Sequence, residues 1–164
     1  QFVSNVLPAD YSWSHPNRRY IAAGLYLPGV VKENTARLGI VIDTSGSIMD
    51  DDLKAFADEL TTIMRDARPA EVEVIYCDAK VHPPSDLFGA DDDIELKAKG
   101  GGGTAFQPGL DWFSRQDDPP EAVIYFTDLQ GPIPTEPDFP VLWVLRSNTW
   151  GTPTQPFGEM VRIK

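Results

Sequence analysis

The chain has 164 residues, of which 41% are hydrophobic and 24% charged, which suits one globular domain and is too short for two. Its formal net charge of −11 and isoelectric point near 4.4 exclude a general nucleic-acid binder, because affinity for phosphates needs clustered Lys and Arg. The longest mostly apolar stretch, residues 20–31, contains two Gly and a Pro and is too short to span a bilayer, so we expect no membrane partner.

The single cysteine, Cys77, excludes a disulfide within the chain and is typical of a reducing compartment. It lies in a strand-like pattern, so we expect a buried structural side chain rather than a catalytic one. No secretory signal is visible, and we expect a cytoplasmic protein. The chain begins with Gln1 rather than Met, so we expect it to be a piece of a longer protein.

Residues 1–35 do not follow the alternation of elements seen in the rest of the chain, and we treat them as an N-terminal extension of a domain that spans residues 36–164. The extension contains the segment YSWSHPNRRY at residues 11–20, which is rich in aromatic and basic side chains. Such a patch can be a binding surface. Packing of the extension on the domain is the interpretation that we favour.

The domain opens with a strand and a helix. Residues 38–42 are a continuous apolar run, the pattern of a strand that is buried on both faces. Apolar residues then recur at helical spacing over residues 50–67, which predicts an amphipathic helix. Its first turn carries three acids, where the helix dipole favours negative charge, and Pro69 ends it.

The next part of the chain is less regular. Residues 72–77 predict a second strand, and residues 79–82 are expected to pair back on it as a short strand after a turn. Residues 83–93 are acidic and rich in turn-forming residues, and residues 94–96 predict a brief strand.

After a run of glycines, residues 105–115 predict a second helix, with Pro108 in the first turn, where spare donors make it tolerable. Three more strands are predicted at residues 122–126, 141–145 and 160–163, the last at an edge of the sheet. This alternation predicts an α/β fold, Rossmann-like, with a mostly parallel central sheet flanked by helices. Open sheets of this kind bind ligands at the carboxyl ends of the strands, beside the switch in strand order.

Three short segments carry the side chains of a metal site. DTSGS at residues 43–47 follows the first predicted strand directly, and TD at residues 127–128 ends the strand at residues 122–126. Between them, GGGGT at residues 100–104 allows the backbone to pass close to an ion and directs a hydroxyl inward. The predicted metal ligands are Asp43, Ser45, Ser47, Thr104 and Asp128.

The charge of this ligand set indicates what the site does. Hard oxygen donors suit Mg²⁺, with Mn²⁺ and Ca²⁺ as alternatives. The two carboxylates supply two negative charges, which no more than balance a divalent cation. The other three donors are neutral hydroxyls, so the ion stays electrophilic. An Asp or Glu of a protein partner can then complete its coordination, which favours metal-dependent protein–protein recognition.

This set of segments resembles the metal-ion-dependent adhesion site of von Willebrand factor type A (VWA) domains over about residues 36–164. The resemblance implies that Ser45, Ser47 and Thr104 bind Mg²⁺ directly or nearly so, and that the two acids often act through water. Ala105 is a departure, because many relatives have Asp or Asn after the threonine, and any support from that side chain is absent here.

Pro16-Asn17-Arg18-Arg19 followed by LYLP at residues 25–28 resembles a family of bacterial proteins classed as metallopeptidases with a C-terminal VWA-like domain. Any peptidase activity would lie upstream of Gln1, because the two histidines, His15 and His82, belong to no His-Glu-x-x-His motif. By the same resemblance, such domains often act as recognition subunits beside an AAA-type ATPase. We expect His82 at an ordinary strand position.

Other interpretations stay open. Residues 43–47 could form only a turn that caps the next helix, with Ser47 or Asp50 as the N-cap. The same ion could activate water in a metal-dependent hydrolase, although no general base stands out from the surface acids. The metal site could also be vestigial. A haloacid-dehalogenase type phosphatase would need an acid in place of Ser45, and no Lys-Ser or Lys-Thr of a phosphate loop follows the glycines.

Overall fold

The computed structural model describes residues 10–16, 28–31, 36–89, 91–97, 99–146, 153–154 and 156–164, and for the first two of these segments it describes the backbone alone. The domain consists of β3 (Arg37–Asp43), α3 (Asp50–Ala67), β4 (Glu71–Cys77), β5 (Asp86–Phe88), α4 (Gln107–Ser114), β6 (Ala122–Phe126), β7 (Val141–Arg146) and β8 (Glu159–Ile163).

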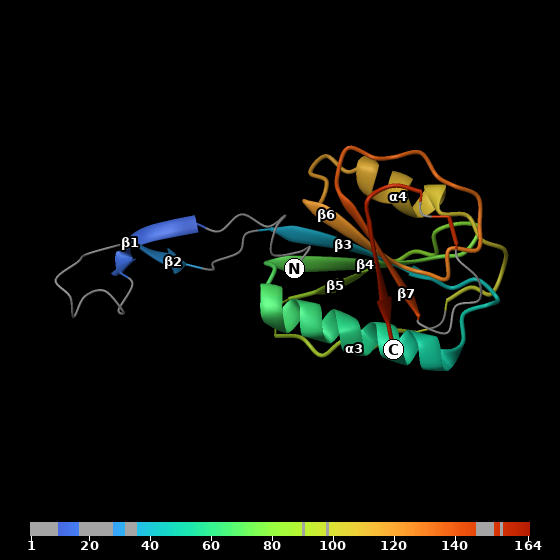
Figure 1. Ribbon diagram of the computed structural model, residues 1–164, viewed down its shortest axis with the longest axis horizontal. Coiled ribbons are helices and arrows are strands. Elements are labelled where there is room, and N and C mark those ends of the chain that lie inside the picture. The colour runs from blue at the N-terminus through green and yellow to red at the C-terminus, as the bar shows by residue number, and fades with distance from the viewer. Residues whose placement is uncertain are drawn as a thin grey trace.

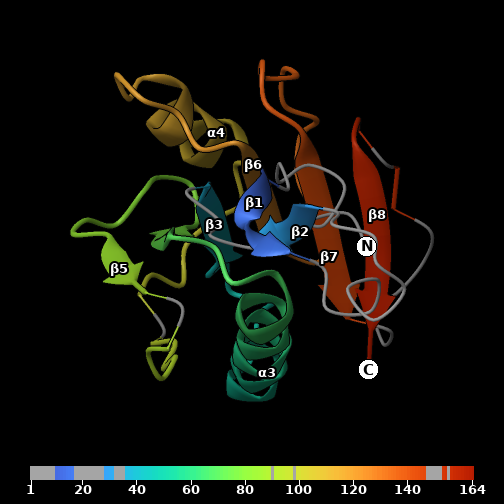
Figure 2. The ribbon, with the colours of Figure 1, turned by 90° about the vertical axis from the view of Figure 1, so that its left-hand side faces the viewer.

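A six-stranded sheet with the order β5-β4-β3-β6-β7-β8 forms the middle of the domain. All neighbouring strands are parallel except β5, which runs antiparallel to β4 at one edge. Helix α3 covers one face and α4 the other (Figures 1 and 2). The predicted α/β fold with a mostly parallel sheet is confirmed, and the order of the strands switches between β3 and β6.

The face of the sheet under α3 is packed with aliphatic and aromatic side chains. Ile40 and Ile42 of β3 point into this cluster, together with Phe56 of α3 and Phe126 of β6, whose ring centroids lie 5.0 Å apart. The alternate residue Val41 belongs to the cluster on the opposite face. A strand that supplies both faces must be apolar at every position, which explains the continuous run in the sequence.

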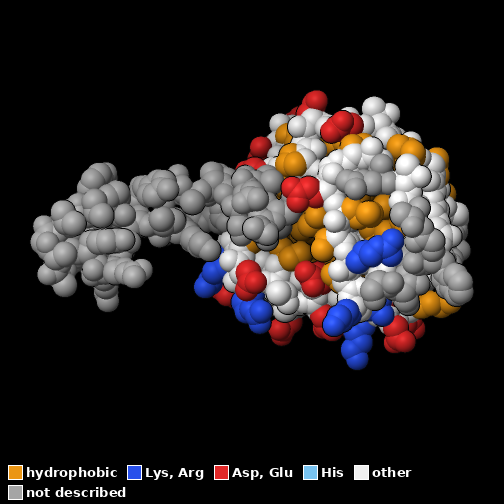
Figure 3. Space-filling model, viewed as in Figure 1, with side chains coloured by type: hydrophobic (Ala, Val, Ile, Leu, Met, Phe, Trp, Pro, Cys, Tyr) orange, Lys and Arg blue, Asp and Glu red, His pale blue; other side chains and the backbone are white. Residues whose placement is uncertain are grey.

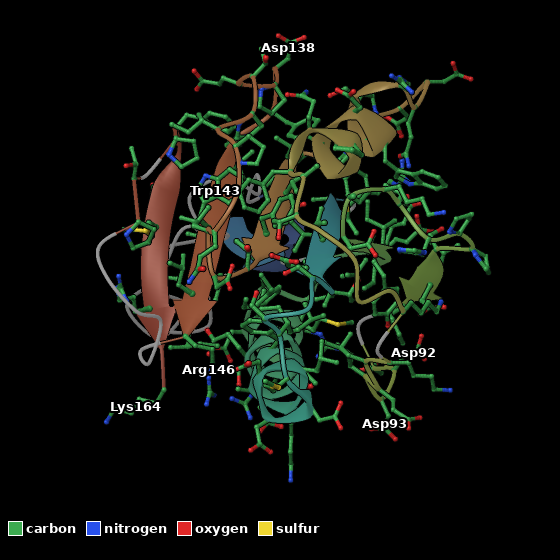
Figure 4. The ribbon with its side chains drawn as sticks, turned by 90° about the vertical axis from the view of Figure 1, so that its right-hand side faces the viewer. Asp92, Asp93, Asp138, Trp143, Arg146 and Lys164 are labelled. Carbon is green, nitrogen blue, oxygen red and sulfur yellow. The ribbon has the colours of Figure 1, made fainter. Side chains whose placement is uncertain are left out.

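The face under α4 is built around aromatic rings. Tyr125 and Trp143 stack with centroids 5.0 Å apart, and Figure 4 shows Trp143 on the α4 side of the sheet. Gly39 of β3 makes room for Phe113 of α4, because a Cβ at position 39 would lie 2.9 Å from Cζ of that ring. The small residue in the middle of the apolar run is therefore required by helix packing.

Most predicted elements are present, and two of them, residues 50–67 and 122–126, have the predicted bounds. The irregular middle part needs correction. Residues 94–96 form no strand, and residues 79–82 contribute a single bridge, from Val81 to Cys77. The segment expected to contain only turns holds β5, whose three residues are too few to show a period of two.

Two helix starts also differ from the predictions. Helix α4 begins at Gln107 rather than at residue 105, with Pro108 in its first turn as expected. The N-cap of α3 is Met49, whose N–H donates to Oδ2 of Asp52 at 3.0 Å. The interpretation in which Ser47 or Asp50 caps α3 is therefore wrong.

Within the N-terminal extension, β1 (Asp10–Pro16) and β2 (Pro28–Val31) pair antiparallel as a two-stranded sheet of their own. Residues 17–27 and the side chain of His15 lie outside the described residues. The packing of the extension on the domain stays a prediction.

The surface of the domain is strongly charged around α3. On the face seen in Figure 3, acidic and basic side chains are interspersed along the lower border, where α3 runs. Within the part of the chain that the structure describes, no helix is long and apolar enough to cross a membrane.

Candidate metal centre

Asp43 is the last residue of β3 and only 1% of its surface is exposed. Its Oδ1 accepts the N–H of Ser45 at 2.8 Å, and its Oδ2 accepts the hydroxyl of Thr127 at 2.6 Å. Both carboxylate oxygens are thus held at fixed positions, one by the following turn and one by the neighbouring strand end. The first and third predicted segments are brought together directly at the switch in strand order.

The two serines of the DTSGS segment lie next to each other. Ser45 is 3% exposed and Ser47 is exposed, and their Oγ atoms are 3.2 Å apart. Because Met49 is the N-cap of α3, neither hydroxyl serves as its cap. The two hydroxyl oxygens therefore form a pair of candidate metal-binding atoms, one beside the buried carboxylate and one near solvent.

The glycine loop, residues 100–104, lies against the DTSGS segment. The N–H of Gly46 donates to the carbonyl oxygen of Gly102 at 3.2 Å, and the hydroxyl of Thr44 donates to the carbonyl oxygen of Lys99 at 2.5 Å. At the end of the loop, a Cβ at Gly131 would lie 3.0 Å from Cγ2 of Thr104. The Thr104 side chain thus lies beside the backbone that follows the third segment, and the structure brings all three segments together.

The turn after β6 is held tightly. Asp128 is 9% exposed, and its Oδ1 accepts the N–H of Gln130 at 3.0 Å. Leu129 has a φ of 55°, a left-handed conformation that costs a non-glycine residue on the order of 1 kcal/mol, and its N–H donates to the Thr127 hydroxyl at 3.0 Å. The strained turn fixes the carboxylate of Asp128 at the carboxyl end of the sheet.

The two acids carry negative charge into a buried region. Burial raises the pKa of Asp43 and the charge of Asp128 adds to the effect, against hydrogen bonds from Thr127 and Ser45. Within the described residues, neither acid forms an ion pair with a Lys, Arg or His side chain. A divalent cation would offset this uncompensated charge, and carboxylate and hydroxyl oxygens are the donors that a hard cation prefers.

The donor set is unlike that of a zinc site. In the described parts of the chain, no three His, Cys, Asp or Glu side chains come together in a way that could hold a metal. A cation at this edge of the sheet would depend on the hydroxyls of Ser45, Ser47 and Thr104 in addition to the two carboxylates. These residues fit Mg²⁺, Mn²⁺ or Ca²⁺ by donor chemistry.

Sequence reasoning missed Asp78, which directly follows β4, whereas Asp43 is the last residue of β3. It is 6% exposed, and its carboxylate accepts the N–H groups of Lys80 and Gly102, both at 3.1 Å. Nε2 of His82 lies 2.9 Å from its Oδ1, so His82 is the partner of an acid rather than an ordinary strand residue. Burial opposes the charge of Asp78, but these hydrogen bonds hold its pKa below the ordinary value. An acid directly after a strand was the available signal.

Cys77 is the last residue of β4 and pairs in register with Asp43. It is free and 1% exposed, and burial raises the pKa of its thiol to about 11. The prediction that it is buried is confirmed.

A sequence profile of the VWA-like domain (DUF2201) matches residues 38–164. The chain belongs to this family. The resemblance to VWA domains is therefore confirmed, while the narrower resemblance to metallopeptidase-associated proteins stays a prediction.

The VWA-like domain is similar to part of a longer protein. An uncharacterized protein from Thermotoga maritima is 35% identical over 120 residues, a match that covers 73% of this chain and 28% of that protein. The VWA-like chain thus spans well under half the length of this relative.

Solved structures similar to the VWA-like domain include two bacterial proteins. The conserved hypothetical protein BatB from Bacteroides thetaiotaomicron superposes with a TM-score of 0.50 at 13% identity, over 78% of this chain and 90% of that one. An aerotolerance-related membrane protein from Bacteroides fragilis gives a TM-score of 0.48 at 17% identity, over 66% of each chain. At 13% identity, the similarity to BatB shows the fold and nothing about function.

Proposed function

We propose that this VWA-like domain recognises a protein partner through a divalent cation, Mg²⁺ in the first place. The cation would be held by Asp43, Ser45, Ser47, Thr104 and Asp128, and an Asp or Glu of the partner would complete its coordination. One observation carries the proposal: the bonds from Thr127 to Asp43 and from Gly46 to Gly102 gather three distant segments at one edge of the sheet.

The charge and exposure of the ligands support recognition over a closed structural site. Two carboxylates no more than balance the charge of a dication, and five ligands leave at least one coordination position of the ion open to a further anionic oxygen. Asp43 and Ser45 are buried, whereas Ser47 is exposed. The site therefore has a buried side that holds the ion and an open side from which a partner's carboxylate can approach.

Net charge and the family resemblance support the choice of partner. The net charge of −11 disfavours a nucleic acid, and we propose a protein that presents an acidic side chain. An AAA-type ATPase in the cytoplasm is the partner class that the resemblance to VWA-like recognition subunits suggests. A role for the same ion in hydrolysis is the competing outcome of the tests below.

Metal binding is tested first, by thermal unfolding of EDTA-treated protein titrated with Mg²⁺, Mn²⁺ and Ca²⁺. A ligand that binds only the native state stabilises it by about 2.7 kcal/mol at a hundred times its Kd. We expect a stabilisation in the wild type that Asp43→Asn and Thr104→Val abolish. Asp66→Asn and Thr61→Val, on the exposed side of α3, are matched controls that should keep it. No shift at millimolar metal, together with no bound Mn²⁺ by electron paramagnetic resonance, would overturn the proposal.

Recognition is tested with short peptides that carry one Asp, each beside its Asn counterpart. We expect Mg²⁺-dependent binding of the Asp peptides by the wild type, lost in EDTA and in Asp43→Asn. Metal-dependent hydrolysis of ester, phosphate or peptide substrates that disappears in Asp43→Asn would instead establish the hydrolase. Peptide binding that is unchanged in EDTA would mean that the metal site is vestigial.

A further inference from the structure

Asp78 is not among the predicted metal ligands, yet it lies at the same edge of the sheet. It directly follows β4, the neighbour of β3, and the N–H of Thr44 donates to the carbonyl oxygen of Cys77 at 3.0 Å. Asp78 is therefore level with the DTSGS segment, one strand away from Asp43 on the side opposite β6.

The contacts of Asp78 lie on both sides of Thr104. Its Oδ2 accepts the N–H of Gly102 at 3.1 Å, and its carbonyl oxygen accepts the N–H of Ala105 at 2.9 Å. Main chain and side chain of one residue thus fix the backbone two residues before and one residue after the candidate ligand. The position of the Thr104 hydroxyl depends on that backbone.

The remaining contacts of the carboxylate hold Asp78 itself. Its Oδ1 accepts the N–H of Lys80 at 3.1 Å and lies 2.9 Å from Nε2 of His82. Together with the N–H of Gly102, two backbone donors and the Nε2 atom of His82 surround the two carboxylate oxygens. A carboxylate can accept from all three, whereas an asparagine offers one oxygen and places an NH₂ group against a donor.

The glycine loop also fits closely over this acid. Gly100 has a φ of 131°, and a Cβ there would lie 2.7 Å from Oγ1 of Thr44, 2.8 Å from Oδ2 of Asp78 and 3.2 Å from Nε2 of His82. The side of the loop that faces β4 is therefore in contact with Asp78 and His82 with no room for a side chain.

We propose that Asp78, supported by His82, is a positioning residue of the metal site, which holds the glycine loop in its metal-binding shape before the cation arrives. This inference rests on the proposed function. Among the described residues, the polar partners of the Asp78 carboxylate are Lys80, Gly102 and His82 rather than the five candidate ligands, and its effect on the cation passes through the backbone around Thr104. Supporting residues of this kind typically change metal affinity by about tenfold to a hundredfold when they are replaced.

The test compares Asp78→Asn with Asp92→Asn, a matched control. Oδ2 of Asp92 also accepts a loop N–H, that of Gly89 at 2.7 Å, and this control loop does not contain the predicted ligands. Two quantities are measured: Mn²⁺ affinity by electron paramagnetic resonance, and hydrogen exchange of the Gly102 and Ala105 amides in metal-free protein. We expect Asp78→Asn to weaken Mn²⁺ binding about tenfold or more and to speed both exchange rates, and Asp92→Asn to change neither.

The outcomes separate this inference from the proposed function. A wild type that binds no Mn²⁺ overturns the proposed function, and this inference with it. If the wild type binds Mn²⁺ and a folded Asp78→Asn binds it with equal affinity, the positioning role alone is overturned. The reason is that replacing a merely structural residue would lower stability in EDTA and leave Mn²⁺ affinity intact. If Asp78→Asn does not fold, His82→Gln decides: weaker Mn²⁺ binding and faster Gly102 exchange support the role, and unchanged values overturn it.

Discussion

The hydroxyl of Thr127 donates a 2.6 Å hydrogen bond to Oδ2 of Asp43, and both residues are buried. The bond joins the carboxyl ends of β3 and β6, which are neighbours in the sheet although 84 positions separate the two residues. The strands on one side of this boundary, β3 to β5, come earlier in the chain than the strands on the other side, β6 to β8. A buried acid is thus held by its neighbour at the place where open α/β sheets bind ligands.

Replacing Thr127 with Val keeps the shape of the side chain and removes its hydroxyl. One oxygen of Asp43 and the N–H of Leu129 would each lose a hydrogen-bond partner. We expect the free energy of unfolding in EDTA to fall by about 1–3 kcal/mol, measured by urea denaturation. Thr61→Val on the exposed side of α3 serves as the control. A loss of less than about 0.5 kcal/mol, the usual range for surface changes, would contradict the role of this bond.

The stabilisation that Asp78 provides should depend on pH. Its pKa is lowered in the folded protein, so the stabilisation is fully present above the pKa of the unfolded chain, about 3.9, and is lost as the pH falls through the folded value. We therefore expect Asp78→Asn to be less stable than the wild type at pH 7, by about 1–3 kcal/mol. The difference should shrink between pH 4 and pH 2 in urea titrations. A difference that is constant over this range would show that the charge of Asp78 does not contribute.

Two glycines of the same loop should respond differently to alanine. Gly100→Ala places a Cβ 2.7 Å from Oγ1 of Thr44 at a φ of 131°, whereas a Cβ at Gly103 meets nothing within 4 Å. We expect Gly100→Ala to lower the free energy of unfolding by more than about 1 kcal/mol and to weaken Mn²⁺ binding, and Gly103→Ala to be neutral or slightly stabilising. Equal effects of the two substitutions on thermal unfolding and on Mn²⁺ affinity would show that the close fit over Asp78 is unimportant.

Cys77 should be unreactive in the native protein. It is 1% exposed and burial raises the pKa of its thiol to about 11, so at pH 8 little thiolate forms and a reagent cannot reach it. We expect Ellman's reagent to modify it only in urea concentrations that unfold the protein. Modification of the native protein at the rate of a free thiol would mean that the edge of the sheet opens more readily than its packing indicates.

The sequence predicted the regular elements well because their physical causes are local. The period of apolar residues in α3 and the continuous apolar run of β6 need no long-range information, and both were predicted with the bounds observed. The three-residue β5 was missed because its existence depends on antiparallel pairing with β4 rather than on its own pattern. For the same reason, the Ile-Glu-Leu segment at residues 94–96 was taken for a strand although it has no strand to pair with in the described sheet.

The candidate site also has a part that the sequence predicted and a part that it did not. DTSGS and TD at the ends of predicted strands, with GGGGT between them, were enough to select Asp43, Ser45, Ser47, Thr104 and Asp128, because residue type and strand end are both readable from sequence. Whether a cation binds to them stays a prediction. His82 was expected at an ordinary strand position and instead lies 2.9 Å from Asp78, a contact that depends on how the chain turns after β4.

What the sequence determined by itself is the helices and the longer strands of the domain, the α/β class and the chemistry of the segments at the strand ends, since these depend on neighbouring residues and their period. Only the tertiary structure decided that β3 and β6 are adjacent, that Thr127 bonds to Asp43, and that Asp78 holds both sides of Thr104. These relationships join residues that are 24 to 84 positions apart. They arise from the order of strands in the sheet and the packing of loops over its edge, which no local pattern in the chain specifies.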